Sequence, residues 1–413
     1  MNKFQVSFLQ VDITPDYQVE LIGCDRADRQ SHGILHRLFA QVLVFKNDCN
    51  IFCLIAIDSL GLTTERSNKL RAEVAKKLNV IASNVMLNFS HTHSAPEPTP
   101  FALNGERYFS YMCEQIVQTV EKTKEAFVPC KTGWALTKTN LGENRREGCT
   151  IIDDRLGALK ISEAESGTPI VVILRISAHA NVLMRGNNMI SSDYFGVARE
   201  KLHEYFSCPV MILQGAAGNM KPFGIHKMFG GDVSDLNTII DILKESVTGL
   251  TFNMQEINDI QMLSKEIEYI SDVPTVAEAE KIAVDSGMEA ASWLSECEKL
   301  RQAGITEQKQ SVEIQFLKIN EGCLCGVPDE IFCEISLTAA ENTHNPLLFL
   351  NGYTNGCTGY LPTAEEWKKG GYETLYSYIS YYQFHGHVMP FRANTAEQII
   401  ELVTNSWIEL KSK

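Results

Sequence analysis

The chain has 413 residues, of which 44% are hydrophobic and 21% charged, the composition of a globular protein long enough to bury a large core. Its net charge of −14 excludes the basic surface of a nucleic-acid binder and predicts repulsion from anionic membranes, so we expect neither partner. The N-terminus lacks a signal-peptide pattern, and the 12 cysteines form no Cys-x-x-Cys pairs. We therefore expect a cytoplasmic protein with reduced thiols.

Strands and helices alternate through the first half of the chain. Apolar runs rich in β-branched and aromatic residues predict five strands, over 39–44, 51–57, 85–89, 170–176 and 210–213. Apolar residues at helical spacing predict one helix over 64–78, before the third strand, and a second helix over 108–126. Short polar or glycine-rich segments follow several of these strands, where they are placed to host chemistry.

Helical periodicity resumes at Val233 in the second half of the chain. The acidic, alanine-rich stretch 275–303 predicts a helical hairpin on the surface, with Gly304 as its stop. We place this helical excursion at about 255–305.

Two apolar runs flank Asn320-Glu321-Gly322 and predict a β-hairpin. No internal repeat and no Pro/Ser-rich linker interrupts the sequence. We therefore expect a single domain over 1–413, of the α/β class, with mixed β-sheets layered with helices.

The most informative segment is Ser-His-Thr-His-Ser-Ala-Pro at 90–96, which directly follows the predicted strand 85–89. Ligands of α/β sheets bind beyond the carboxyl ends of strands. In an extended chain His91 and His93 point to the same side, so one imidazole can bind a metal and the other can serve the reacting group. Alternatively, both are hydrogen-bonded loop histidines, because His-x-His alone is a weak signal.

His179 repeats this arrangement, because it follows the apolar run 170–176 and a small residue. Taken alone, His179 is more simply a core histidine with its hydrogen bonds satisfied. It becomes a candidate ligand because it repeats the sequence arrangement of His91. The small-residue turn 214–222 follows another buried strand. It either offers backbone amides to a ligand or is an ordinary tight turn.

Three further segments each allow two interpretations. Gly-Asp-Val-Ser at 231–234 resembles a nucleophile turn, but Asp232 or Ser234 is more simply a helix N-cap. Glu330 lies at a strand-to-helix junction, as a ligand or as an acid favoured by the helix dipole. The aromatic, glycine-rich stretch around Tyr360 and Tyr372 either lines a site or packs a surface loop.

Taken together, these segments resemble the neutral/alkaline (non-lysosomal) ceramidase family. The resemblance spans nearly the whole chain and is far more specific than any one motif. Its motifs, in order, are Val-Asp-Ile-Thr-Pro at 11–15, Gly-Ile-Leu-His at 33–36, Asp58, Ser-His-Thr-His-Ser at 90–94, Asn144-Arg145, His179, Ser-Asp-Tyr at 192–194, Gln-Gly-Ala-Ala-Gly at 214–218, Pro-Asp-Glu at 328–330, Gly-Tyr-Leu-Pro-Thr at 359–363 and Tyr372. The resemblance implies a ceramidase-catalytic-domain-like fold.

The resemblance also implies one Zn²⁺ per chain, bound by two histidines, a glutamate and a tyrosine. These ligands fall at His91, His179, Glu330 and Tyr360. Two imidazoles and one carboxylate are a common catalytic zinc set, which leaves a position open for water or substrate. Tyrosine is the unusual member of the set.

The same resemblance places His93, Arg145 and Tyr372 around the reacting carbonyl. His93 would carry the proton to the leaving group, while the other two would stabilise the oxyanion. Asp58 and Asp193 are candidates for orienting the metal-binding histidines.

Two positions depart from the family pattern Gly-Asp-Val-Ser-Pro. The aspartate position is Asn219 here and the serine position is Lys221, and we count both among the candidate catalytic residues. We expect neither the signal sequence nor the C-terminal immunoglobulin-like domain of the family's secreted members.

These observations predict a zinc-dependent hydrolase that uses metal-activated water on an amide or ester of a small, soluble substrate. Two alternatives remain open. One is true ceramide amidohydrolysis, and the other is a metal-binding protein that has lost catalysis and binds a ligand.

Overall fold

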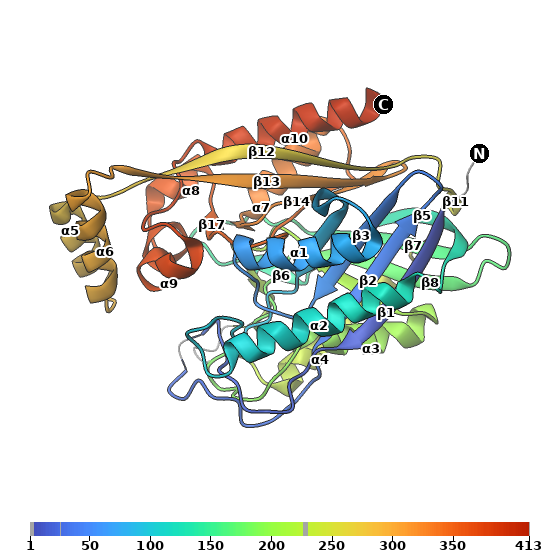
Figure 1. Ribbon diagram of the computed structural model, residues 1–413, viewed down its shortest axis with the longest axis horizontal. Helices are drawn as coiled ribbons and strands as arrows, with labels where there is room; N and C mark the ends of the chain where they lie inside the picture. Colours follow the sequence, from blue (N-terminus) through green and yellow to red (C-terminus); the bar gives the residue numbers. More distant parts are fainter. Residues whose placement is uncertain (1–3, 25, 226–229, 413) are drawn as a thin grey trace.

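The largest sheet of the computed structural model, which describes residues 4–24, 26–225 and 230–412, folds back on itself (Figure 1). Its strands follow the order β4-β3-β2-β1-β5-β7-β8-β9, with β11 paired to β5. Only β3–β4 and β8–β9 pair in parallel, each joined through a helix. The strands are β1 (Gln5–Asp12), β2 (Phe39–Lys46), β3 (Ile51–Ile57), β4 (Val85–Phe89), β5 (Val128–Lys138), β7 (Arg155–Glu163), β8 (Pro169–Ile176), β9 (Val210–Gln214) and β11 (Gln255–Glu256).

The two outermost strands of this sheet, β4 and β9, meet along a seam. Asn88 of β4 donates a hydrogen bond from Nδ2 to the carbonyl of Gln214 over 3.2 Å and accepts one from the Gln214 amide over 2.8 Å. Apolar side chains from the two halves of the sheet pack against each other inside the fold. The fold thereby brings the carboxyl ends of β4, β8 and β9 to one place.

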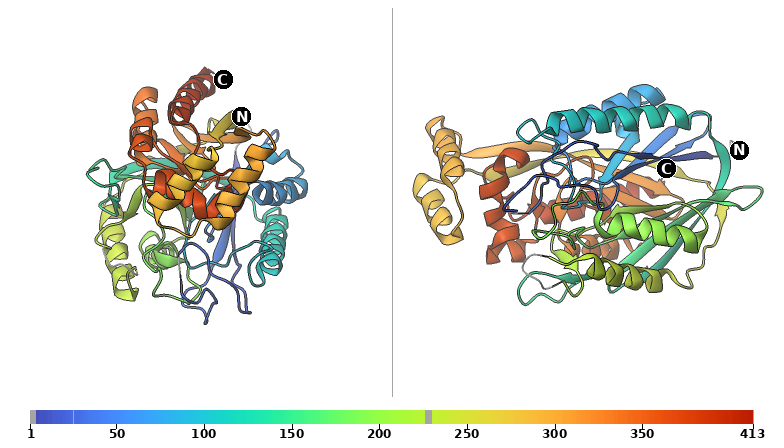
Figure 2. Two further views of the ribbon diagram at one scale, coloured as in Figure 1. Left: turned by 90° about the vertical axis from the view of Figure 1, so that its left-hand side faces the viewer. Right: turned by 90° about the horizontal axis from the view of Figure 1, so that it is seen from below.

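Helices cover both outer faces of the folded sheet. Seen from below, α1 and α2 lie along one side and α3 and α4 along the other, with the strands between them (Figure 2, right). Thr63 caps the start of α1, and Asn79 ends it in the left-handed conformation. These helices are α1 (Thr64–Leu78), α2 (Gly105–Thr123), α3 (Asp193–Phe206) and α4 (Val233–Val247).

A second sheet, in the order β12-β13-β14-β16, packs against the first and carries α7 and α10 on its other side. Its long β12–β13 ribbon reaches beyond the body to the hairpin of α5 and α6 (Figure 1). These elements are β12 (Ile260–Asp272), β13 (Glu307–Ile319), β14 (Gly322–Gly326), β16 (Leu348–Asn351), α5 (Val276–Ser286), α6 (Ala291–Gln302), α7 (Cys333–Thr343) and α10 (Thr395–Ser412).

Short elements complete the chain near the ends of these strands. β6 pairs with β10, and β15 pairs in parallel with β17. They are β6 (Gly142–Asn144), β10 (Met220–Pro222), β15 (Glu330–Ile331), β17 (Tyr360–Leu361), α8 (Ala364–Lys369), α9 (Ser377–His385), the 3₁₀ turn η1 (Ala82–Asn84) and the π-turn η2 (Tyr372–Tyr376). Among the described residues, no helix is both long and apolar enough to cross a membrane.

The predicted α/β class with layered mixed sheets and helices is confirmed. The helical excursion predicted around 255–305 is present as the hairpin of α5 and α6, and the strand β12 precedes these helices within that range. The hairpin at Asn320, whose φ is 50°, joins β13 to β14 as predicted.

Candidate metal centre

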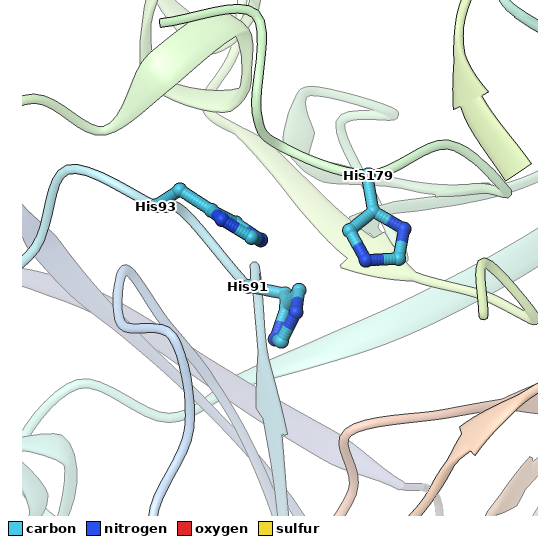
Figure 3. Close-up of side chains that lie close together, drawn as sticks. All are labelled: His91, His93 and His179. Atoms are coloured by element: carbon cyan, nitrogen blue, oxygen red, sulfur yellow. The ribbon is translucent and has the colours of Figure 1, made fainter. Parts of the chain in front are cut away.

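Three buried histidines meet beyond the carboxyl ends of β4 and β8 (Figure 3). His91 and His93 follow β4, and His179 follows β8. One potential ligand atom from each lies within 4.8 Å of those of the other two, so the group could hold a metal ion. The parallel pairs β3–β4 and β8–β9 direct both chain segments to the same edge, which is where α/β sheets bind ligands.

The backbone at His91 is turned and not extended. Its φ is 61°, in the left-handed region, and its amide donates to the carbonyl of Ser59 over 2.9 Å. The extended His-x-His geometry expected from the sequence is therefore wrong at this residue. The rings of His91 and His93 nevertheless reach the same space, with centroids 5.0 Å apart and planes at 82°.

Backbone carbonyls determine that Nδ1 of each of the three rings carries a proton. Each Nδ1 lies 2.6 Å from a carbonyl oxygen, that of Leu60 for His91, of Gly23 for His93 and of Ala217 for His179. A carbonyl only accepts, so each Nδ1 carries the proton. In the neutral imidazole, Nε2 then presents a lone pair, as a metal ligand must.

Glu330 on β15 faces two of these lone pairs. Its Oε2 lies 3.3 Å from Nε2 of His91 and 3.2 Å from Nε2 of His179, and the Tyr353 hydroxyl donates to the same oxygen over 3.3 Å. Burial raises the pKa of Glu330, whereas protons on Nε2 of His91 and His179 would lower it well below its ordinary value. Two nitrogen lone pairs and an ionised carboxylate repel one another unless a cation lies between them, so these residues fit a metal ion.

His93 offers another nitrogen to the same space. Its Nε2 is buried and has no hydrogen-bond partner among the described residues. Burial and then the neighbouring His91 and His179 lower the pKa of His93 well below its ordinary value, so the ring is neutral. The chain thus offers two overlapping donor sets, one with Glu330 and one with His93.

Tyr360 lies beside Glu330, because the parallel pairing of β15 with β17 places these two residues in register. Arg145 donates from Nη2 to the Tyr360 hydroxyl over 3.0 Å and to the carbonyl of Gly218 over 2.6 Å. Its Nε lies 3.0 Å from Oε1 of Glu373. Protein acceptors therefore engage Nη2 of the guanidinium that the resemblance placed at the reacting carbonyl, and Arg145 contacts the site through Tyr360.

A cavity of about 50 Å³ opens onto these groups. Tyr372 lines it as expected, with its ring 6.2 Å from that of Tyr360. The lining residues are Ile22, Gly23, Leu60, His91, His93, Glu330, Cys357, Tyr360, Tyr372, Tyr381, Phe384 and His385.

The sequence did not single out the lining residues Tyr381 and His385, nor Tyr353, which contacts Glu330. Tyr353 has a φ of 53° and its ring lies 4.2 Å from that of His91. The Asn-Gly-Tyr run at 351–353 was the available turn signal for it. Tyr381 and His385 lie on the aromatic helix α9, where no pattern separates a lining residue from a core residue.

The two aspartates expected to orient the histidines have other partners. Asp58 forms an ion pair with Arg199 and accepts from the Phe39 amide over 2.8 Å. Asp193 accepts from three backbone amides, those of Val182, Leu183 and Tyr194. Backbone carbonyls hold the Nδ1 atoms of the three histidines in their place, and the orienting role of the two aspartates stays a prediction.

Asn219 and Lys221 do not line the cavity either. Asn219 accepts from the Cys333 amide over 2.9 Å and donates to Glu334 over 2.8 Å, so it joins its turn to the start of α7. Lys221 forms an ion pair with Glu143 over 3.0 Å, across the β10–β6 pair. Because side chains alternate along a strand, Lys221 points to the face opposite that of its buried neighbours Met220 and Pro222.

The helix α4 begins with the cap expected from Gly-Asp-Val-Ser, and the structure identifies the capping residue. The Asp232 carboxylate accepts from the amides of Ser234 and Asp235 over 2.8 and 3.3 Å. Ser234 is exposed and donates its hydroxyl to Asp232, so it is not the cap.

Comparison with solved structures identifies the fold that carries this buried histidine cluster. The neutral ceramidase of Pseudomonas aeruginosa matches with a TM-score of 0.76 and 18% identity, over 100% of this chain and 75% of that one. A ceramidase complexed with C2 matches with a TM-score of 0.76 and 16% identity, over 100% of this chain and 76% of that one. This chain has a ceramidase-like fold. No family model and no curated protein sequence matches it.

Proposed function

We propose that this chain is a metal-dependent hydrolase of amide or ester bonds, with one Zn²⁺ held by His91, His179, Glu330 and Tyr360. The convergence of Nε2 of His91 and Nε2 of His179 on the Glu330 carboxylate, beside a cavity lined by His91 and Glu330, carries this proposal. The ceramidase-like fold supports it, because the solved structures that share the fold are ceramidases.

The side chains around these ligands have distinct roles in the proposed reaction. When bound, zinc supplies Lewis-acid chemistry and a hydroxide nucleophile at neutral pH. His93 accepts a proton at its unpartnered Nε2 and returns it to the leaving group, while the Gly23 carbonyl holds its tautomer. Tyr372, which is 42% exposed and lines the cavity, keeps its proton at neutral pH and donates to the developing oxyanion.

The cavity favours a small substrate. A volume of about 50 Å³ accommodates a short acyl group. Ile22, Leu60 and Phe384 supply apolar surface beside the polar groups. Hydrolysis of ceramide itself is the second candidate, favoured by the likeness to ceramidases, but Lys221 occupies the family's serine position and pairs with Glu143.

A carbonyl-hydrolysis screen tests the proposal. The protein is stripped with a chelator, reloaded with zinc, and assayed on acetyl and butyryl amides and esters and on long-chain ceramide in detergent micelles. We expect zinc-dependent turnover of the short substrates and a far lower rate on ceramide. Glu330→Gln should abolish turnover, and His203→Ala, a change at an exposed position of α3, should not.

The possible outcomes separate the candidate functions. Comparable turnover of micellar ceramide would establish the second candidate instead. Tight zinc binding without turnover of any substrate would refute the hydrolase proposal and favour a ligand-binding protein.

A further inference from the structure

A second imidazole with an unpaired nitrogen, that of His385, lines the cavity and comes from a segment of the chain far from the three clustered histidines. His385 is the last residue of α9, and Gly386 follows it with a φ of 85°. The side chain is 7% exposed and lines the cavity. Its Nδ1 has no hydrogen-bond partner among the described residues. Buried polar atoms are almost always paired, so an unpaired one beside a cavity indicates a missing partner.

The ring of His385 is neutral, which decides what that partner must be. Burial and then His387 lower the pKa of His385 to about 3. The backbone of Cys357 accepts a hydrogen bond from the ring. A neutral imidazole has one donor and one acceptor, so the remaining nitrogen accepts. Its partner must therefore be a donor, such as a hydroxyl or an N–H group.

Neighbouring rings hold the imidazole in place. Its centroid lies 5.5 Å from that of Tyr378, 5.7 Å from that of Phe384 and 6.2 Å from that of Tyr381. Tyr378 is itself anchored, because its hydroxyl donates to the carbonyl of Tyr360 over 3.1 Å. This packing fixes the direction of the ring before any ligand arrives, which favours specific recognition.

We infer that His385 is a specificity-determining residue that accepts a hydrogen bond from a hydroxyl or N–H group of the substrate. This inference rests on the proposed function and narrows its substrate class to amides or esters with a donor close to the scissile bond. A site built to pair with such a donor rejects an analogue that lacks it, because the analogue leaves the buried acceptor unpaired.

Matched probe pairs test the inference, each comparing a free hydroxyl with its methyl ether. One pair is hydroxyacetyl and methoxyacetyl 4-nitroanilide, with the donor on the acyl side. The other is N-(2-hydroxyethyl)acetamide and N-(2-methoxyethyl)acetamide, with the donor on the amine side. For at least one pair we expect the zinc-loaded wild-type protein to prefer the hydroxyl form by about 10-fold or more in kcat/KM.

Three variants assign that preference to His385. His385→Phe keeps an aromatic ring without an acceptor and should remove the preference, mainly by raising KM for the hydroxyl probe. His385→Asn places an amide near Nδ1 and should restore part of it. His203→Phe is the matched surface control. Zinc content and thermal melting establish that each variant is folded.

The outcomes distinguish this inference from the proposed function. Equal loss on both members of each pair in His385→Phe, or no preference in the wild-type protein, would overturn the role of His385. If no probe is hydrolysed, dissociation constants of the same pairs measured by calorimetry decide the question. A preference in binding without turnover contradicts the proposed function alone, and no binding of any probe contradicts both.

Discussion

Nη2 of Arg145 donates a hydrogen bond to the hydroxyl oxygen of Tyr360 over 3.0 Å. Burial raises the pKa of Tyr360 well above its ordinary value, and the nearby Arg145 opposes that effect. A cation beside the hydroxyl favours the phenolate, which is the form that binds a metal. We therefore propose that Arg145 is a positioning residue for Tyr360, the least usual of the four proposed ligands.

The Arg145–Tyr360 pair predicts coupled effects on zinc affinity. Arg145→Met should weaken zinc binding by about 10–100-fold, as loss of a group that orients a ligand does. Tyr360→Phe should weaken it too, and the double variant should show less than the sum of the two effects. Competition with a chromogenic chelator measures each affinity, with the exposed Arg37→Met as control. Additive losses would show that Arg145 does not act through Tyr360.

Single substitutions decide which of the two overlapping donor sets binds the metal. His91→Ala and His179→Ala should each lose most of the zinc, measured by elemental analysis of purified protein. His93→Ala should keep it, while kcat falls by roughly 10²–10⁴-fold through loss of an acid–base group. Loss of zinc in His93→Ala would instead establish the three-histidine set. Full retention in His91→Ala and His179→Ala would refute the site.

The start of α4 predicts a stability effect without a catalytic one. Asp232→Ala removes the carboxylate that accepts from the amides of Ser234 and Asp235, and should cost about 1 kcal/mol in the free energy of unfolding. Ser234→Ala should change stability less, and neither variant should change turnover. Urea denaturation and the short-substrate assay measure the two properties. A covalent acyl-enzyme trapped on Ser234 would contradict the proposed mechanism.

A buried carboxylate far from the cavity predicts how stability depends on pH. Oδ1 of Asp153 accepts from Nε of Arg155 over 2.8 Å, and Oδ2 accepts from Nη1 of Arg175 over 2.9 Å. Burial would raise the pKa of Asp153, but Arg175 and Arg155 lower it to about 2. Because the folded pKa is the lower one, this stabilisation is complete above the ordinary value of 3.8 and is lost as pH falls towards 2.

Asp153→Asn should destabilise the protein at pH 7 by about 3–5 kcal/mol, because the buried Arg175 loses its counter-charge. Between pH 4 and about 2 the variant should also lose less stability than the wild-type protein. Urea denaturation at pH 7, 4 and 3 measures both effects. Parallel pH profiles for the two proteins would show that Asp153 does not carry this dependence.

The sequence predicts best what depends on local periodicity. Helix α1 and the strands β3 and β4 coincide with the predicted ranges, because caps and apolar runs mark their ends. The placement of His91 and His179 at strand ends follows from the same runs. The predicted helix over 108–126 is α2, which spans Gly105–Thr123, and its first three residues, Gly-Glu-Arg, carry no apolar side chain that would mark its start.

What the sequence does not predict depends on contacts between distant segments. The ion pair of Asp58 joins it to Arg199, 141 residues away, and removes it from the histidines. The parallel pairing of Glu330 with Tyr360 and the place of His385 on the cavity wall likewise arise only when separate segments meet. Burial also sets the protonation of these groups, and burial is a property of the assembled fold.

The seam at Asn88 holds more than two strands. Its Nδ2 also donates to the carbonyl of Gly352 over 3.0 Å and to Oγ1 of Thr354 over 3.1 Å, so one carboxamide joins both edges of the large sheet to the segment after β16. His91 lies three residues further on, and Tyr353 lies between the two acceptors. The separation between His91 and His179 is therefore set by the closure of the sheet at Asn88. A chain in which this seam has not closed does not bring His91 and His179 together.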